Sequence, residues 1–184
     1  MTLLIAGVVL WWAAHLFKRL APGARNALGS AGYPVMAVSI ILSVVLMVVG
    51  YRSADGAVYW GPDPMWVGIN NLLMVVAFYF YAASAAKGAK IWLGTKVRHP
   101  QLTGFSIWAA AHLLVNGDTP SFILFGGLLV WAIVEIFLIN AQEGPWVRPA
   151  RAPFKKEIVA VVVTIVVVTV VMGIHYALGV SPFG

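Results

Sequence analysis

Long apolar runs dominate this chain and restrict what it can fold into. Of its 184 residues, 61% are hydrophobic and only 10% are charged, a balance far from that of a water-soluble domain. A helix needs roughly 20 mostly apolar residues to cross a bilayer core. Six windows approach this length: 3–20, 33–51, 65–86, 99–115, 121–141 and 157–178. The sequence therefore predicts a polytopic membrane protein.

The pattern within these windows indicates helices rather than barrel strands, because apolar and polar residues do not alternate along them. We expect an all-α fold, a single bundle of six transmembrane helices that forms one domain over residues 1–184. The fourth window is the shortest and is flanked by Pro100 and Asn116. We expect it either to tilt little or to pack among the other helices.

Basic residues gather in alternate connections between the windows. All but one of the 12 Lys and Arg residues belong to this set: Lys18, Arg19, Arg25, Lys87, Lys90, Lys96, Arg98, Arg148, Arg151, Lys155 and Lys156. Only Arg52 falls on the other side. Because cytoplasmic loops are rich in Lys and Arg, we expect both termini on the periplasmic side of a bacterial inner membrane. Confinement of the charge to short loops favours contact with anionic lipid headgroups over nucleic acid.

Several chemistries are excluded by composition and spacing. The chain has no cysteine, so it has no disulfide, thiolate metal site or cysteine nucleophile. It also lacks the paired histidines of zinc hydrolases, the serine nucleophile elbow, the phosphate loop and the dinucleotide fingerprint. The sequence therefore identifies no catalytic residue.

All four histidines lie within or at the end of a predicted span: His15, His99, His112 and His175. Imidazoles are costly in lipid, so an intramembrane histidine is by default a functional-site candidate; the alternative is a hydrogen-bonded packing residue. Histidines on separate helices suit haem, whose two axial ligands approach the iron from opposite faces. Depth along the helices pairs His15 with His99 and His112 with His175, because His15 and His112 differ by about 12 Å.

The residues before His112 are candidates for a cofactor wall. Ala109 is small and leaves room beside the helix, while Trp108 and Gly104 lie one and two turns before His112 on its face. These residues either line a macrocycle or let neighbouring helices pack closely.

Glu135 is the only acid well inside a predicted span. A carboxyl group there must be neutral, paired or in a wet cavity. It lies at a depth similar to that of His15, so a proton relay between the two is one interpretation. A structural hydrogen bond to a tryptophan or a backbone group is the other.

Several motifs resemble those of the NnrU family of bacterial membrane proteins, which is related to the zeta-carotene isomerase of plants and cyanobacteria. The motifs are Arg98-His-Pro-Gln, Trp108-Ala-Ala-Ala-His112-Leu-Leu-Val-Asn-Gly-Asp118, His15 with Arg19, Ala21-Pro22 and Arg25, Leu124-Phe-Gly-Gly127, and His175 with Gly179-Val-Ser-Pro182. Together they extend over nearly the full chain.

The resemblance implies a link to denitrification and nitric oxide metabolism, in an accessory, sensor or electron-transfer role. The isomerase branch uses haem b to isomerise a carotenoid from cis to trans, and its two axial ligands match His15 and His112. His99 and His175 are the alternates. A cysteine one turn before the second ligand is replaced here by Ala109. The alternative function is a haem-dependent isomerase or oxidoreductase of a lipid-soluble, carotenoid-like substrate. Expected partners are the bilayer, such a small molecule and other membrane proteins.

Overall fold

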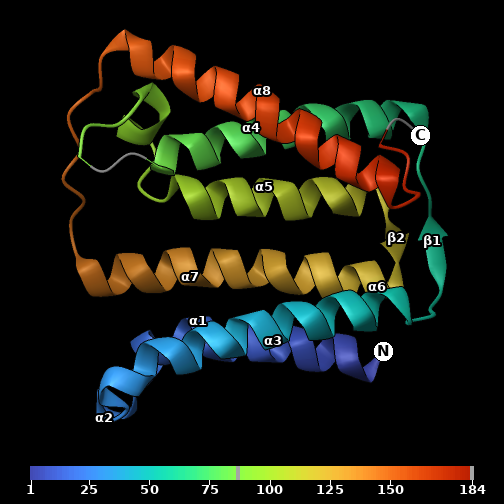
Figure 1. Ribbon diagram of the computed structural model, residues 1–184, viewed down its shortest axis with the longest axis horizontal. Helices are drawn as coiled ribbons and strands as arrows, with labels where there is room; N and C mark the ends of the chain where they lie inside the picture. Colours follow the sequence, from blue (N-terminus) through green and yellow to red (C-terminus); the bar gives the residue numbers. More distant parts are fainter. Residues whose placement is uncertain (86–87, 183–184) are drawn as a thin grey trace.

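Six long helices lie side by side and alternate in direction (Figure 1). They are α1 (Thr2–Leu20), α3 (Gly32–Arg52), α4 (Pro64–Ala85), α5 (Pro100–Val115), α7 (Gly127–Glu143) and α8 (Phe154–Ala177). The structure is a computed structural model that describes residues 1–85 and 88–182. The predicted all-α membrane fold is confirmed.

Five of these helical stretches have the length and composition of a membrane span: α1, Gly29–Arg52, α4, Thr119–Glu143 and α8. The exception is α5, whose 16 residues extend only about 24 Å, against about 30 Å for a hydrocarbon core. The expected count of six full spans is therefore not met by α5. Ala86, where the third predicted window ends, and Lys87 lie outside the described residues.

The basic connections meet at one end of the molecule, and both termini lie at the other (Figure 1). The basic end contains α2 (Pro22–Ala27), η1 (Gly29–Ala31) and η2 (Trp92–Thr95). At the opposite end, β1 (Val58–Trp60) pairs antiparallel with β2 (Gly117–Asp118). The indole of Trp60 donates to the carbonyl oxygen of Leu113 at 3.0 Å, which fastens this strand pair to α5.

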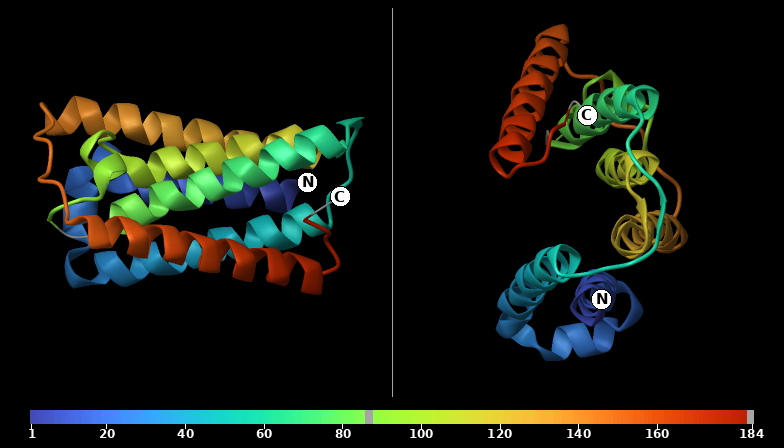
Figure 2. Two further views of the ribbon diagram at one scale, coloured as in Figure 1. Left: turned by 90° about the horizontal axis from the view of Figure 1, so that it is seen from above. Right: turned by 90° about the vertical axis from the view of Figure 1, so that its right-hand side faces the viewer.

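The helices of the bundle form an open arc (Figure 2). Their contacts follow a single row in the order α3, α1, α7, α5, α4, α8. Small residues allow the closest approaches along this row. A Cβ on Gly7 would lie 2.7 Å from the backbone nitrogen of Met47, and one on Gly104 would lie 2.7 Å from the carbonyl oxygen of Ala77.

The fifth predicted window is one continuous helix made of three segments. It begins with α6 (Thr119–Ser121), passes through the π-helical η3 (Phe122–Gly126) and continues as α7. Asp118 caps the start, because its Oδ1 accepts a hydrogen bond from the backbone N–H of Ser121 at 2.7 Å. A π-helical turn changes the rotation of the residues within it, and here it contains Phe125, which lies against His112.

Candidate functional site

His15 is held on α1 by a hydrogen bond to its own helix. Its Nδ1 lies 2.9 Å from the carbonyl oxygen of Trp11. A carbonyl can only accept, so Nδ1 carries the proton and Nε2 keeps an available lone pair. The imidazole also contacts two indoles, with ring centroids 4.0 Å away for Trp11 and 4.8 Å away for Trp131.

His112 repeats this arrangement on α5. Its Nδ1 lies 3.0 Å from the carbonyl oxygen of Trp108, and the same reasoning leaves Nε2 with the lone pair. Its ring stacks on Phe125, with centroids 4.5 Å apart and an interplanar angle of 28°. Both histidines are therefore fixed in the tautomer that presents Nε2 to a ligand.

The two imidazoles are tilted toward each other along the long axis of the molecule. A helical side chain leans toward the N-terminus of its helix, and each ring here bonds to the residue four positions earlier. Because α1 and α5 run in opposite directions (Figure 1), His15 leans away from the basic end and His112 leans toward it. His15 contacts Trp131 and His112 contacts Phe125, so the rings are offset by about 9 Å at 1.5 Å per residue.

Aromatic rings connect the two histidines. Phe105 stands at the centre, with its ring centroid 6.1 Å from Trp11, 5.1 Å from Trp108 and 5.3 Å from Trp131. We call the following set the aromatic cluster: Trp11, His15, Phe105, Trp108, His112, Phe125 and Trp131. It joins α1, α5 and the η3–α7 helix.

Two polar groups in the aromatic cluster are buried without a partner. The indole nitrogens of Trp11 and Trp131 have no hydrogen-bond acceptor within the described part of the chain. Buried polar groups are nearly always paired, so two orphaned N–H donors beside His15 mark a place where a polar ligand atom would be stabilised.

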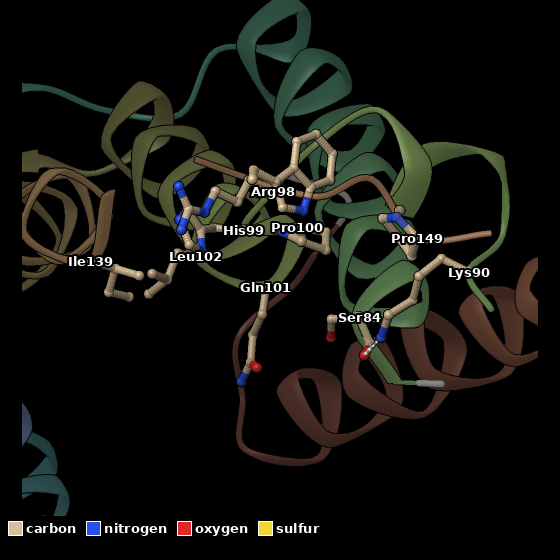
Figure 3. Close-up of a pocket in the computed structure, with 11 residues that line it drawn as sticks. Ser84, Lys90, Arg98, His99, Pro100, Gln101, Leu102, Ile139 and Pro149 are labelled. Carbon is tan, nitrogen blue, oxygen red and sulfur yellow. Dashed lines mark hydrogen bonds between the residues drawn. The ribbon is translucent and has the colours of Figure 1, made fainter. Parts of the chain in front are cut away.

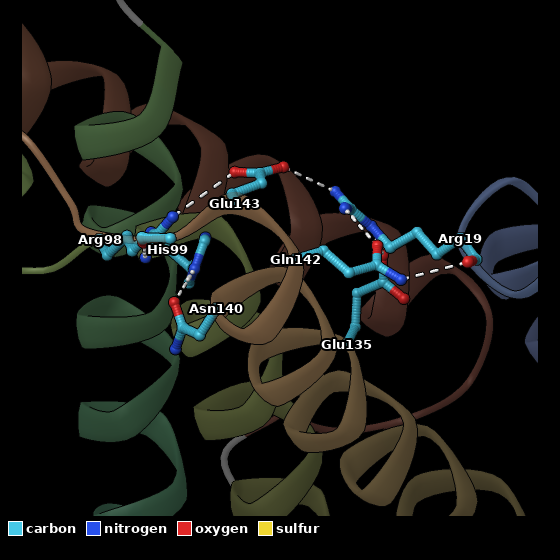
Figure 4. Close-up of polar contacts among 8 residues, drawn as sticks. Arg19, Arg98, His99, Glu135, Asn140, Gln142 and Glu143 are labelled. Atoms are coloured by element: carbon cyan, nitrogen blue, oxygen red, sulfur yellow. Dashed lines mark hydrogen bonds and ion pairs between the residues drawn. The ribbon is translucent and has the colours of Figure 1, made fainter.

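Glu135 pairs with Arg19 rather than with His15 (Figure 4). Its Oε1 accepts from Arg19 Nε at 3.2 Å, and its Oε2 is buried with no partner among the described residues. Arg19 also reaches Glu143 at 3.1 Å and Gln142 at 3.3 Å. Glu135 lies one turn after Trp131, whose ring contacts His15, and no hydrogen bond joins Glu135 to His15 among the described residues.

The other two histidines lie outside the aromatic cluster. His99 precedes α5 at the basic end, where its Nε2 lies 2.9 Å from Oδ1 of Asn140 (Figure 4). His175 is on α8, with Nδ1 2.8 Å from the carbonyl oxygen of Val171. The structure thus places the imidazole of His99 against Asn140 and that of His175 against its own helix.

The small residues of α5 serve helix packing. Ala109 is completely buried, and Gly104 faces the backbone of α4 at Ala77. Trp108 does contact His112, with the centroids of the two rings 4.9 Å apart. In the described residues, no three His, Cys, Asp or Glu side chains gather as a metal site.

Sequence reasoning missed Trp11, Phe105, Phe125, Trp131 and Arg19 as members of this region. One signal was present: the pattern Trp-x-x-x-His occurs twice, at residues 11–15 and 108–112. Its spacing of four residues places the tryptophan carbonyl and the histidine ring on one helix face. The contacts of Phe105, Phe125 and Trp131 depend on which helices are neighbours, which no local pattern indicates.

Comparison with known proteins gives one match. The family model described as "NnrU protein" matches residues 3–182. No curated protein and no solved structure matches the chain. The matched region includes both histidines of the aromatic cluster and the Arg19–Glu135 ion pair.

Proposed function

This chain belongs to the NnrU family, and from that premise we propose that it is a haem b-binding membrane protein with an accessory, sensor or electron-transfer role in nitric oxide metabolism and denitrification. We assign His15 and His112 as the ligands. One observation carries the proposal: two imidazoles on antiparallel helices lean toward each other, and each is fixed through Nδ1 with Nε2 available.

The donor chemistry fits haem iron. Metal-bound histidines usually donate their second ring N–H to a carbonyl or carboxylate, which orients the ring and makes the ligating nitrogen more basic. The carbonyl oxygens of Trp11 and Trp108 supply these acceptors. The chain offers no thiolate as a competing ligand, so imidazole coordination is the form that its residues support.

The side chains around His15 and His112 also fit a haem. The aromatic cluster surrounds the histidines with apolar rings, the kind of side chain that a porphyrin would contact. The orphaned indole N–H groups of Trp11 and Trp131 would donate to an acceptor carried by the ligand, such as a carboxylate, and would then be satisfied.

Two histidine ligands favour an electron-transfer or sensor role over catalysis. Haem iron supplies reversible one-electron redox chemistry. His15 and His112 would both be used to hold the haem, and fully buried Ala109 stands where the isomerase branch has a cysteine. In this reading the protein residues hold the ring, exclude water and tune its charge environment.

A second function is favoured by one apolar cavity. This cavity of about 140 Å³ is lined by Ala77, Phe78, Tyr81, Phe105 and Trp108, so it shares two residues with the aromatic cluster. It is smaller than the roughly 300 Å³ of a usual ligand pocket, and it would take a segment of a chain rather than a whole molecule. An isomerase or oxidoreductase acting on a lipid-soluble polyene is therefore our alternative.

For the cellular location, we propose a bacterial inner membrane with the basic end in the cytoplasm and both termini in the periplasm. The support is the separation of charge along the molecule: the connections at one end carry the basic residues, while Arg52 ends α3 at the other. The positive-inside rule orients such a protein.

An absorption spectrum of the purified protein, with and without dithionite, tests the cofactor. We expect a Soret band after expression with sufficient haem, and its loss in both His15→Ala and His112→Ala. His99→Ala is the matched control, because His99 lies at the basic end against Asn140, and it should keep the band. A wild-type protein without a Soret band would refute the proposal. Loss in His112→Ala and His175→Ala, with retention in His15→Ala, would reassign the ligand pair.

A further inference from the structure

A second cavity lies at the basic end, and its lining residues are drawn in Figure 3. It has a volume of about 360 Å³ and lies between the α4–α5 and α7–α8 connections. Its lining includes Lys90, Arg98 and His99, and no acidic side chain of the described residues lines it. A volume of this size is within the range of small-molecule sites.

Backbone hydrogen bonds hold the two connections together around this cavity. The backbone N–H of Lys90 donates to Ala150 at 2.9 Å, and that of Ala152 donates back to Lys90 at 2.7 Å. On the other side, Nη1 of Arg98 donates to the carbonyl oxygen of Gly144 at 2.7 Å. The cavity walls are therefore built by main-chain pairing and not by exposed side chains alone.

The cationic groups of the cavity are held in place by carbonyl oxygens. Nζ of Lys90 donates to the carbonyl oxygen of Ser84 at 2.9 Å (Figure 3). The side chain of Arg98 is only 19% exposed, and its Nη2 lies 3.7 Å from Oε2 of Glu143, a residue outside the cavity lining. An ordered ammonium and an ordered guanidinium in one cavity attract a polyatomic anion, for which both are common partners in proteins.

An apolar floor continues from these cations toward the interior. Leu102 of α5 and Ile139 of α7 line the cavity, and Leu102 also packs against the cluster of Leu16 and Trp131. The cavity thus presents cations at the end of the helices and apolar side chains deeper down. This arrangement, with cationic side chains at the membrane surface and apolar side chains below them, matches an anionic amphiphile oriented as in a membrane leaflet.

We propose that this cavity binds a phosphate group at the membrane surface, and that an anionic phospholipid headgroup is its source. The side chains of Lys90 and Arg98 attract the phosphate into the cavity from opposite sides, and the beginning of the acyl region lies along Leu102 and Ile139. The site is independent of the haem proposal, because none of its lining residues belongs to the aromatic cluster.

The test compares two variants with the same change in charge. Lys90→Gln/Arg98→Gln removes both cavity cations but keeps side-chain N–H donors for Ser84 and Gly144. Lys96→Gln/Lys155→Gln removes two exposed cations near the same end that do not line the cavity. Native mass spectrometry of the full chain, titrated with phosphatidylglycerol or phosphatidylcholine, measures lipid retention.

We expect the wild type to retain phosphatidylglycerol in preference to phosphatidylcholine. The cavity variant should lose phosphatidylglycerol affinity on the order of tenfold or more, since each basic residue near an anionic surface contributes about 1 kcal/mol. The control variant should bind as the wild type does. Equal loss in both variants, or no loss in the cavity variant, would overturn the site. Circular dichroism of the cavity variant separates lost binding from lost structure.

Inorganic phosphate distinguishes the two sources of the anion. Retained phosphatidylglycerol that millimolar phosphate does not displace assigns the site to a lipid. If the wild type binds inorganic phosphate, the cavity variant does not, and neither retains lipid, the cavity is still a phosphate site. That result would overturn the phospholipid as the source of the phosphate. An unchanged Soret band in the cavity variant shows that the outcome is separate from haem binding.

Discussion

Arg19 and Glu135 form an ion pair that joins α1 to α7, with 3.2 Å between Nε and Oε1. The two side chains are 23% and 11% exposed, so the pair lies between a surface ion pair and a buried one. Its two members differ in their other partners. Arg19 keeps Glu143 and Gln142 when Glu135 is lost, whereas no other partner of Glu135 is found among the described residues.

This asymmetry predicts unequal costs for the two neutralising substitutions. Arg19→Gln leaves a buried carboxylate without its cation and should destabilise the protein by about 2 to 3 kcal/mol. Glu135→Gln should cost about 1 kcal/mol, because Gln can still accept from Arg19. Thermal unfolding in detergent measures both, and the double variant should resemble Glu135→Gln. Equal costs would show that the charge of Glu135 does not depend on Arg19.

The same carboxylate should influence haem redox chemistry if His15 is a ligand. A negative charge near the iron stabilises the oxidised form, so Glu135→Gln should raise the midpoint potential, on the order of 50 mV. If Glu135 also takes part in proton transfer, the midpoint potential of the wild type should depend on pH, whereas that of the Gln variant should not. Redox titration of the haem-loaded protein decides both points. Identical, pH-independent potentials would remove Glu135 from the proposed relay.

Close packing between α4 and α5 should be sensitive to one added methyl group. Gly104→Ala would bring a Cβ within 2.7 Å of the carbonyl oxygen of Ala77, and such overpacking costs about 1 to 3 kcal/mol. Gly173→Ala is the matched control on α8, where no atom lies within 4 Å of the added Cβ. It should be neutral or stabilising by up to about 1 kcal/mol, since alanine favours helix. A Gly104→Ala protein that melts like the wild type would contradict the observed helix approach.

The proposed orientation can be tested with single cysteines, because the chain has none of its own. Lys96→Cys at the basic end and Ser181→Cys at the opposite end are both at exposed positions. In intact cells whose outer membrane admits the reagent, an impermeant maleimide should label Ser181→Cys alone. Lys96→Cys should react only after the inner membrane is opened. The reverse pattern would place the basic end in the periplasm and contradict the proposed topology.

The sequence predicts the helices of this protein well because lipid imposes a strong local constraint. A backbone in hydrocarbon must satisfy its own hydrogen bonds, so apolar length alone indicates each helix. The basic connections then predict the alternation seen in Figure 1. The flanking Pro100 and Asn116 indicated that α5 would be short. They did not indicate how α5 lies relative to the bilayer.

The partners of buried side chains could not be predicted in the same way. Arg19 was expected as a topological charge and as part of the motif that follows His15, but its pairing with Glu135 depends on α1 lying beside α7. The stacking of Phe125 on His112 depends on the π-helical turn η3, which leaves no hydropathy signal. Depth along the helices also did not indicate that the imidazole of His99 is hydrogen-bonded to Asn140, because depth says nothing of which side chains face each other.

In the open row of helices, α7 lies between two groups of helices. On one side of it lie α1 and α3, and on the other lie α5, α4 and α8, so His15 and His112 belong to opposite halves of the arc. The aromatic cluster spans the two halves, because Trp11 of α1 stacks on Phe105 of α5. A ligand that coordinates both histidines would link the two halves of the arc. The curvature of the whole protein would then depend on whether this ligand is bound.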